Sequence, residues 1–164
     1  MPINKSEGFV RPTLKQDNHT LISIMRETKI FKDDEVKIAE ELLQEYFKTQ
    51  NPTDYRFYSY VTKEGDACGF ACFGSTHITK STYDFYWLVV SPHDQRKGVG
   101  TNLLKFVEHT IINEGGKLIL VETSSIDSYA AARRFYEYNG YRQLAKINAY
   151  YDINDDLVIY GKYF

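Results

Sequence analysis

A glycine-rich stretch at residues 95–101 combines the residue types and spacing that can bind a phosphate group. It follows a short apolar run at residues 86–90 that ends at Ser91-Pro92, where proline removes a ladder donor, so the run predicts a buried strand. Apolar residues recurring every three or four positions predict a helix from the glycine turn to Gly115-Gly116. Unpaired N–H groups at the positive end of such a helix bind phosphate. The residues assigned to a phosphate-bearing ligand are Gln95, Arg96, Lys97, Gly98, Val99, Gly100 and Thr101.

Two common nucleotide motifs do not match this stretch. A Walker loop needs glycine, then lysine, then serine or threonine, but here Lys97 precedes Gly98. The dinucleotide fingerprint needs a third glycine, and Leu103 occupies that position. Both motifs are therefore disfavoured.

The pattern that remains, Gln/Arg-x-x-Gly-x-Gly, resembles the signature of the GNAT superfamily of acetyl-CoA-dependent N-acyltransferases. A strand ending in Val-Ser-Pro precedes it, and an apolar strand at residues 118–123 follows it. Residues 132–141 resemble the family's closing pattern of alanine, aromatic-tyrosine and glycine-aromatic. The resemblance covers about residues 55 to 145 and implies a single-domain α/β (α+β) GNAT fold over residues 1–164, with acetyl-CoA as acyl donor and no metal.

The hydrophobic periodicity predicts a mixed, mostly antiparallel sheet of about seven strands with about four helices. Three consecutive strands after residue 55 imply antiparallel pairing, and the strand-helix-strand unit over residues 84–123 implies a parallel pair. A closing hairpin is expected to turn at residues 154–156. The predicted strands are 8–14, 55–61, 67–74, 83–90, 117–123, 141–151 and 157–164, and the predicted helices are 17–28, 33–48, 98–114 and 127–139.

Composition and charge narrow the function classes. The chain has 164 residues, 43% apolar and 26% charged, which is ordinary for one globular domain. A net charge of −2 disfavours a nucleic-acid partner, which needs clustered basic charge. No apolar run approaches the ~20 residues of a membrane span, and the polar start MPINKSEG lacks a signal-peptide core, so no membrane partner and a cytoplasmic location are expected.

The two cysteines do not suggest chemistry. Cys68 and Cys72 lie four residues apart on one predicted strand, where a disulfide is geometrically disfavoured. With only four histidines in the chain, a zinc site lacks ligands. We therefore expect both to be core-filling thiols, and an acyl-enzyme mechanism is disfavoured.

The resemblance also implies roles for particular residues. Tyr136 occupies the position at which the family often places a tyrosine that protonates the coenzyme A thiolate. The backbone of Leu88, Val89 and Val90 corresponds to the strand that pairs with the pantetheine arm, with the side chains in the core. Many members carry asparagine seven residues before the tyrosine, where this chain has Tyr129. The residues that could replace that contact are Ser124, Ser125 and Tyr129.

The general base stays open among three residues. Two-residue alternation would place Asp84, Tyr86, Leu88 and Val90 on one face of the strand, and family members often set catalytic Glu or His at the first two positions. Glu122, on the neighbouring strand, is the other carboxylate, and burial would raise the pKa of such a group toward a useful range. Each carboxylate is equally well interpreted as a structural acid or an anchor for the substrate ammonium, and Tyr86 as a residue that orients substrate.

These observations predict an N-acetyltransferase that moves the acetyl group of acetyl-CoA to a small-molecule amine by direct attack in a ternary complex. The alternatives are acetylation of a protein N-terminus or lysine, and a non-catalytic acyl-CoA-binding sensor. The polar loop at residues 75–82 would exclude a peptide acceptor if it folded over the cleft. Similar proteins are commonly dimers, which makes a homodimer a reasonable expectation.

Overall fold

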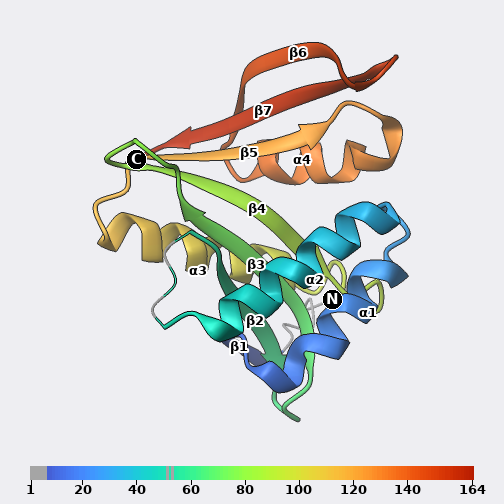
Figure 1. The fold of residues 1–164 in the computed structure, drawn as a ribbon, viewed down its shortest axis with the longest axis vertical. Coiled ribbons are helices and arrows are strands. Elements are labelled where there is room, and N and C mark those ends of the chain that lie inside the picture. Colours follow the sequence, from blue (N-terminus) through green and yellow to red (C-terminus); the bar gives the residue numbers. More distant parts are fainter. Residues whose placement is uncertain (1–6, 51, 53) are drawn as a thin grey trace, which may run out of the picture.

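Seven strands form one sheet through the middle of the molecule, and helices cover both of its faces (Figure 1). The structure is a computed structural model that describes residues 7–50, 52 and 54–164. The polar start that suggested a cytoplasmic location therefore lies mostly outside the described residues. The strands are β1 (Gly8–Pro12), β2 (Arg56–Thr62), β3 (Ala67–Ser75), β4 (Thr82–Val90), β5 (Leu118–Ser124), β6 (Arg142–Asp152) and β7 (Asp155–Tyr163).

The sheet is mixed, as predicted. Its strand order is β1-β2-β3-β4-β5-β7-β6. The pairs β1–β2, β2–β3, β3–β4, β5–β7 and β6–β7 are antiparallel, and β4–β5 is parallel. The sequence patterns did not indicate that β7 would insert between β5 and β6.

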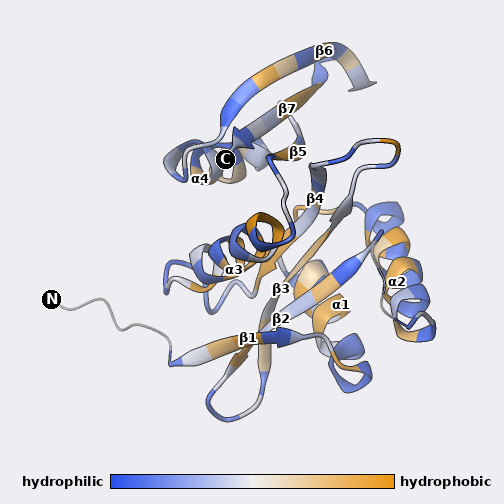
Figure 2. Cartoon of the chain, turned by 90° about the vertical axis from the view of Figure 1, so that its left-hand side faces the viewer, coloured by the Kyte–Doolittle hydropathy of each residue, from blue (hydrophilic) through white to orange (hydrophobic). Residues whose placement is uncertain are grey.

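The helices divide between the two faces of the sheet. Helices α1 (Asn18–Glu27) and α2 (Asp33–Lys48) pack on one face, and α3 (Val99–Asn113) packs on the other (Figure 2). Helix α4 (Ala130–Tyr138) adds Tyr136 to the α3 side, and short 3₁₀ turns, η1 (Lys15–Asp17) and η2 (Asp127–Tyr129), precede α1 and α4. The predicted helix at 127–139 is thus a 3₁₀ turn followed by an α-helix.

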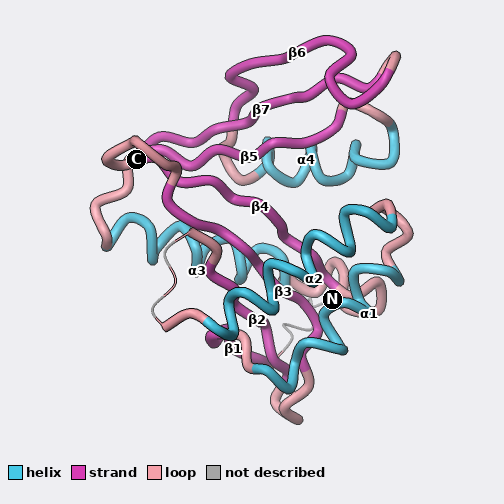
Figure 3. Tube along the Cα trace, in the orientation of Figure 1, coloured by secondary structure: helices cyan, strands magenta, loops and turns pink. Residues whose placement is uncertain are grey.

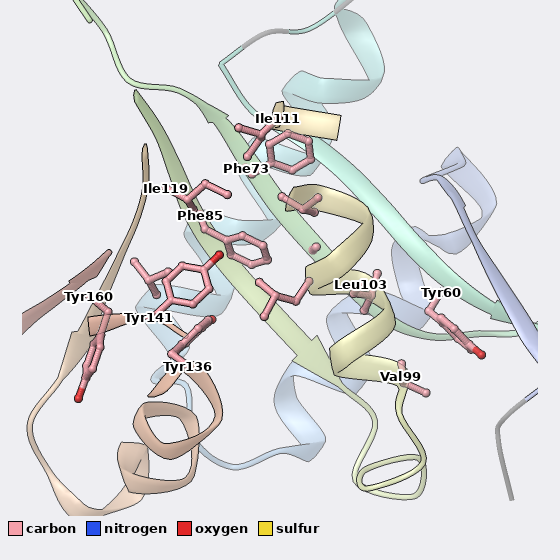
Figure 4. Close-up of a cluster of buried hydrophobic side chains, with 14 of the residues drawn as sticks. Tyr60, Phe73, Phe85, Val99, Leu103, Ile111, Ile119, Tyr136, Tyr141 and Tyr160 are labelled. Atoms are coloured by element: carbon pink, nitrogen blue, oxygen red, sulfur yellow. The ribbon is translucent and has the colours of Figure 1, made fainter. Parts of the chain in front are cut away.

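Two hydrophobic clusters fill these layers. The buried members of the α3 cluster, most of them drawn in Figure 4, are Tyr60, Cys68, Ala71, Phe73, Phe85, Val99, Leu103, Leu104, Val107, Ile111, Ile119, Val121, Tyr136, Tyr141, Val158 and Tyr160. Those of the α1–α2 cluster are Leu21, Ile22, Ile24, Met25, Val36, Ala39, Leu43, Phe57, Ala67, Phe70, Cys72 and Val89. Both cysteines are buried and unbridged, and burial raises the pKa of the Cys68 thiol to about 11. They are inert core residues, as expected.

Helix α3 begins and ends where the glycines predicted. Gly98 has φ 87°, a left-handed conformation that glycine adopts without a steric penalty, and the segment from β4 to α3 is a loop (Figure 3). At the other end Gly115 has φ 86°, and the N–H of Gly116 donates to the carbonyl oxygen of Ile111 at 2.8 Å. The helix therefore presents its first turn to the carboxyl end of β4.

The closing hairpin turns earlier than predicted. Strand β6 ends at Asp152 and β7 begins at Asp155, so the turn is formed by Ile153 and Asn154 rather than by residues 154–156. Asn154 has φ 64°, and asparagine tolerates the left-handed conformation that a tight hairpin requires. Asp155 is thereby a strand residue and is buried.

Candidate active site

Strands β4 and β5 lie side by side at one end only. Their parallel pairing covers three residue pairs, from Thr82↔Leu118 to Asp84↔Leu120. Beyond these pairs the two strands diverge (Figure 1). Within the described chain, the rest of β4 has no strand partner on this edge, although backbone N–H and C=O groups need hydrogen-bond partners. The split therefore offers an open strand edge to a ligand that carries amide groups.

A β-bulge interrupts β4 inside this split. Cys72 of β3 pairs with Trp87, and the next residue, Phe73, pairs with Phe85. Tyr86 is therefore the extra residue, inserted between two paired ones. A bulge of this kind bends the strand and redirects the side chains that follow it.

The expectation that Asp84, Tyr86, Leu88 and Val90 share one face is wrong, because the bulge breaks the two-residue alternation. Leu88 and Val90 pack against the α3 cluster, whereas Tyr86 packs against the α1–α2 cluster. The side chain of Val89 is in the core, as predicted, but those of Leu88 and Val90 are only partly buried and line a cavity.

The first of two neighbouring cavities has a volume of about 380 Å³ and lies between β4, the glycine turn, α3 and α4. It contains most of the residues that the sequence assigned to the cofactor. Its lining residues are Ile30, Leu88, Val90, Gln95, Arg96, Gly98, Gly100, Thr101, Ala131, Ala132, Phe135 and Tyr136.

The first turn of α3 supplies unpaired backbone donors beside this cavity. The helical ladder begins with the N–H of Asn102, which donates to the carbonyl oxygen of Gly98 at 2.9 Å. The N–H groups of Val99, Gly100 and Thr101 precede it and have no intrahelical acceptor, and no side chain caps this end of the helix. The positive end of the helix dipole thus borders the cavity, an arrangement suited to a phosphate group.

Five predicted cofactor residues do not line the first cavity: Val89, Lys97, Val99, Ser124 and Tyr129. Val89 is buried against α1 and α2, and Val99 is buried under α3. The Nζ of Lys97 forms an ion pair with Asp94 at 3.0 Å. Val89 and Val99 are left with backbone contacts alone.

Tyr136 is held in the wall of the first cavity with a free hydroxyl. It projects from α4 into the α3 cluster (Figure 4), and its ring packs edge-on against Phe135 and Tyr141 at centroid distances of 5.5 and 5.6 Å. Burial raises its pKa, so the hydroxyl is protonated at neutral pH. Within the described chain this hydroxyl has no hydrogen-bond partner, and it is not one of the fully enclosed side-chain atoms that lack one. It is a proton donor without an acceptor.

The second cavity has a volume of about 290 Å³ and lies across the split, under the loop that joins α1 to α2. It shares Ile30 with the first cavity. The sequence had assigned Tyr86 and Glu122 to catalysis, and Ser124 and Tyr129 to the cofactor; all four line this cavity. Its lining residues are Ile30, Phe31, Lys32, Glu35, Tyr86, Trp87, Glu122, Thr123, Ser124, Ile126, Tyr129, Tyr151 and Asp155.

The two predicted carboxylates differ in position. Glu122 lines the second cavity, and burial followed by the negative charge of Asp84 raises its pKa. Asp84 lines neither cavity and accepts a hydrogen bond from the Thr76 hydroxyl at 2.8 Å. Of the two predicted carboxylates, Glu122 is therefore the one that lines a cavity.

Tyr86 is half-buried beside Trp87, and its ring lies 6.5 Å from the indole. Burial, followed by the charge of Asp84, raises its pKa, so this hydroxyl is also protonated at neutral pH. A protonated tyrosine can orient an amine but cannot accept its proton.

Several residues of the second cavity were missed by the sequence analysis. Glu35 of α2 accepts hydrogen bonds from the Lys32 N–H at 2.7 Å and from the Tyr129 hydroxyl at 3.3 Å. Asp155 accepts a hydrogen bond from the hydroxyl of Ser124. The acidic start of α2 was visible in the sequence, but nothing in the sequence placed it beside β5 and β7.

The loop at residues 75–82, which was expected to exclude a peptide acceptor if it folded over the cleft, lies away from both cavities. Residues 76–81 join β3 to β4, and no residue of the segment 75–82 lines either cavity. The loop therefore does not exclude a peptide.

Among the described residues, no helix is long and apolar enough to span a membrane, and no three His, Cys, Asp or Glu side chains cluster as metal ligands would.

Comparisons with known proteins agree with this geometry. Residues 53–143 match the family model of the acetyltransferase (GNAT) domain. A crystal structure of a GNAT-family protein from Desulfovibrio desulfuricans is 36% identical, with a TM-score of 0.88 over 95% of this chain and 98% of that one. An aminoglycoside 6′-N-acetyltransferase in complex with coenzyme A is 16% identical, with a TM-score of 0.74 over 94% of this chain and 96% of that one, and shows the fold alone.

A curated relative, the S-(2-succino)cysteine N-acetyltransferase of Bacillus subtilis, is 34% identical over 56 residues. That match covers 34% of this chain and only 34% of the relative. The family match, in contrast, spans more than half of the chain. This protein therefore belongs to the GNAT acetyltransferases.

Proposed function

We propose that this protein is an N-acetyltransferase that transfers the acetyl group of acetyl-CoA to the amine of a small molecule by direct attack. One observation carries the proposal: the two cavities meet at Ile30, with an unpartnered tyrosine hydroxyl on one and the carboxylate of Glu122 on the other. A thioester and an amine held in these cavities would have a proton donor and a proton acceptor on opposite sides.

The first cavity fits coenzyme A. Its open β4 edge suits the amides of a pantetheine arm, and the first turn of α3 suits the pyrophosphate. A Cβ at Gly100 would lie 3.6 Å from both Val90 and Phe135, so the absence of a side chain there leaves space against the cavity wall. Two solved structures of the same fold are complexes with coenzyme A, which supports this assignment.

The chemistry requires two proton movements. When bound, acetyl-CoA supplies a thioester whose carbonyl carbon accepts the amine nitrogen while the carbon–sulfur bond breaks. Glu122 takes the proton that the amine loses, helped by its raised pKa. Tyr136 gives its proton to the departing thiolate. Asp84 acts on Glu122 through its charge, and Ser124 and Tyr129 contact the acceptor or the end of the cofactor arm.

A small acceptor matches the volume of the second cavity, about 290 Å³, which lies near the lower end of the ~300–1,000 Å³ typical of ligand pockets. The curated Bacillus relative acts, by its name, on a cysteine derivative, and thus also on a small amine. The ribosomal-protein-S18-alanine N-acetyltransferase of Escherichia coli shares the fold at 19% identity, so a protein N-terminus is the alternative acceptor. A homodimer stays a prediction that analytical ultracentrifugation tests.

The test is thiol release from acetyl-CoA with amino acids, S-(2-succino)cysteine, diamines, aminoglycosides and short peptides. Tyr136→Phe is assayed beside wild type, and Tyr138→Phe, on the same helix but 90% exposed, is the matched control. We expect amine-dependent turnover that falls at least about 100-fold in Tyr136→Phe alone, with unchanged affinity for acetyl-CoA. Tight acetyl-CoA binding without turnover on any amine would favour the sensor, and turnover restricted to peptides would favour the protein acceptor.

A further inference from the structure

The charged groups that line the second cavity do not balance. Among the described residues that line it, three carboxylates, those of Glu35, Glu122 and Asp155, stand against one ammonium, that of Lys32, which leaves a formal surplus of two negative charges. Arg133 does not line this cavity, and its Nη1 donates to the backbone carbonyl oxygens of Ser124 and Ile126 at 2.6 and 2.9 Å.

The negative charges of the three carboxylates all reach the hydroxyl of one residue, Tyr151. Tyr151 of β6 lines the same cavity, and burial together with the charges of Glu122, Asp155 and Glu35 raises its pKa to about 12. A ligand beside this hydroxyl would therefore lie within the electrostatic reach of all three. A cation is favoured there and an anion is disfavoured.

Two of the carboxylates are held in place and the third is free. Glu35 is fixed by the Lys32 N–H and the Tyr129 hydroxyl, and Asp155 by the Ser124 hydroxyl. In the described chain Glu122 has no hydrogen-bond or ion-pair partner. This difference separates a group that can take a proton from groups that can only present a fixed charge.

The walls of the cavity are aromatic. Phe31 and Tyr129 pack edge to face at 6.5 Å on one side, and Tyr86 and Trp87 form a pair at the same centroid distance on β4. Aromatic faces attract ammonium groups and also pack against methylene chains. The lining therefore suits an aliphatic cation better than a sugar or a hydrated anion.

We propose that the acceptor carries a second cationic group besides the amine that is acetylated, and no carboxylate, as a short aliphatic diamine does. The reacting nitrogen must lose its proton before it attacks, so it cannot neutralise the cavity. Once Glu122 has accepted that proton, Glu35 and Asp155 still outnumber Lys32 by one charge. A second ammonium on the acceptor supplies the missing positive charge. This inference rests on the proposed function.

The test uses three amines that differ only at the far end: 1,4-diaminobutane, butylamine and 4-aminobutyrate. Their second groups are an ammonium, a methyl and a carboxylate. We expect kcat/KM to fall at least about tenfold from the diamine to butylamine, the effect of roughly one charge pair, and further for 4-aminobutyrate. The preference for the diamine should shrink as salt is added. Equal use of the three amines, or a preference for 4-aminobutyrate, would overturn the inference.

Two variants test which carboxylates of the cavity attract the second ammonium group of the acceptor. Glu35→Gln keeps an oxygen for the Lys32 N–H and removes the charge, and Asp155→Asn keeps an acceptor for Ser124. Each should lower kcat/KM for the diamine about tenfold and leave that for butylamine within about twofold. Glu41→Gln, on the exposed side of the same helix as Glu35, is the control and should change neither. An equal loss on both amines would show a structural role for these carboxylates and contradict the inference.

Calorimetric titration of 1,4-diaminobutane into the protein with coenzyme A separates the two proposals. Binding of the diamine, weakened by Glu35→Gln, supports the inference even if no amine is acetylated, and the proposed function alone would then fail. Turnover of butylamine without diamine binding would support the function and overturn the inference. Circular-dichroism melting of each variant verifies that the fold is intact.

Discussion

Substitution of Gly100 by alanine should separate cofactor binding from folding. Gly100 is the second residue of α3, has an ordinary negative φ, and lines the first cavity. A Cβ built there meets the rings and methyls of Phe135 and Val90 at 3.6 Å, an ordinary contact distance, so the fold accepts it. The same methyl would occupy space between the first turn of the helix and the ligand, where a backbone N–H is expected to approach the pyrophosphate.

The substitution should raise the stability of the fold and lower the affinity for coenzyme A. Alanine favours a helix by up to about 1 kcal/mol over glycine, and about half of that in the first turn gives a rise in Tm of roughly 1–2 °C for a chain of this length. Loss of one phosphate hydrogen bond and close packing against the methyl should raise the Kd for coenzyme A at least about tenfold, or about 1.4 kcal/mol.

Melting curves and isothermal titration with coenzyme A measure both quantities on the same sample. Asn113→Ala, at the far end of α3 and outside both cavities, is the control and should leave the Kd unchanged. A Gly100→Ala protein that is as stable as wild type and binds coenzyme A equally well would refute the assignment of the pyrophosphate to this turn.

Three further predictions concern charge and packing. The pKa of Glu122 is raised, which means that its contribution to stability is present at low pH and is lost as the carboxyl group ionises with rising pH. Glu122→Gln should therefore have a higher Tm than wild type at pH 8 and an equal Tm near pH 4. The same variant should lose activity. Burial alone would raise the pKa of Asp17, but its 2.6 Å pair with Arg11 holds it below its usual range. Asp17→Asn should therefore cost about 2 kcal/mol in urea unfolding at pH 7, and this difference should fade as pH falls below about 4. Gly116→Ala should cost about 1–3 kcal/mol in the same assay, since its Cβ would collide with Ile111; an unchanged midpoint would contradict that packing.

The sequence was most informative where local rules act alone. The glycines at 98 and 115 predicted the ends of α3 because few other residues adopt positive φ there without strain. The apolar spacing of residues 99–111 predicted the buried face of that helix, and the run at 86–90 predicted the end of β4. These features depend on contacts within a few residues, so periodicity reveals them.

The acceptor side depends on contacts between distant segments. Glu35 and Tyr129 are 94 residues apart and hydrogen-bonded, and Ser124 meets Asp155 across 31 residues. The bulge at Tyr86 arises from the register with β3 and has no marker in the sequence of β4 itself. Strict alternation therefore failed next to the point, between Trp87 and Leu88, where β4 changes from lining the second cavity to lining the first.

The split between β4 and β5 is stable because each strand is held from its outer side. Strand β4 pairs with β3 over residues Tyr83–Val90, and β5 pairs with β7 at seven positions, Leu118–Ser124. The backbone hydrogen bonds that β4 and β5 do not form with each other are thus missing from only one edge of each strand. The bulge at Tyr86 bends β4 within the gap. An edge that pairs with no strand in the resting fold can pair with the amides of a ligand arm without breaking any bond. In the proposed mechanism, the feature that lowers the internal pairing of the sheet is the one that orients a thioester between Tyr136 and Glu122.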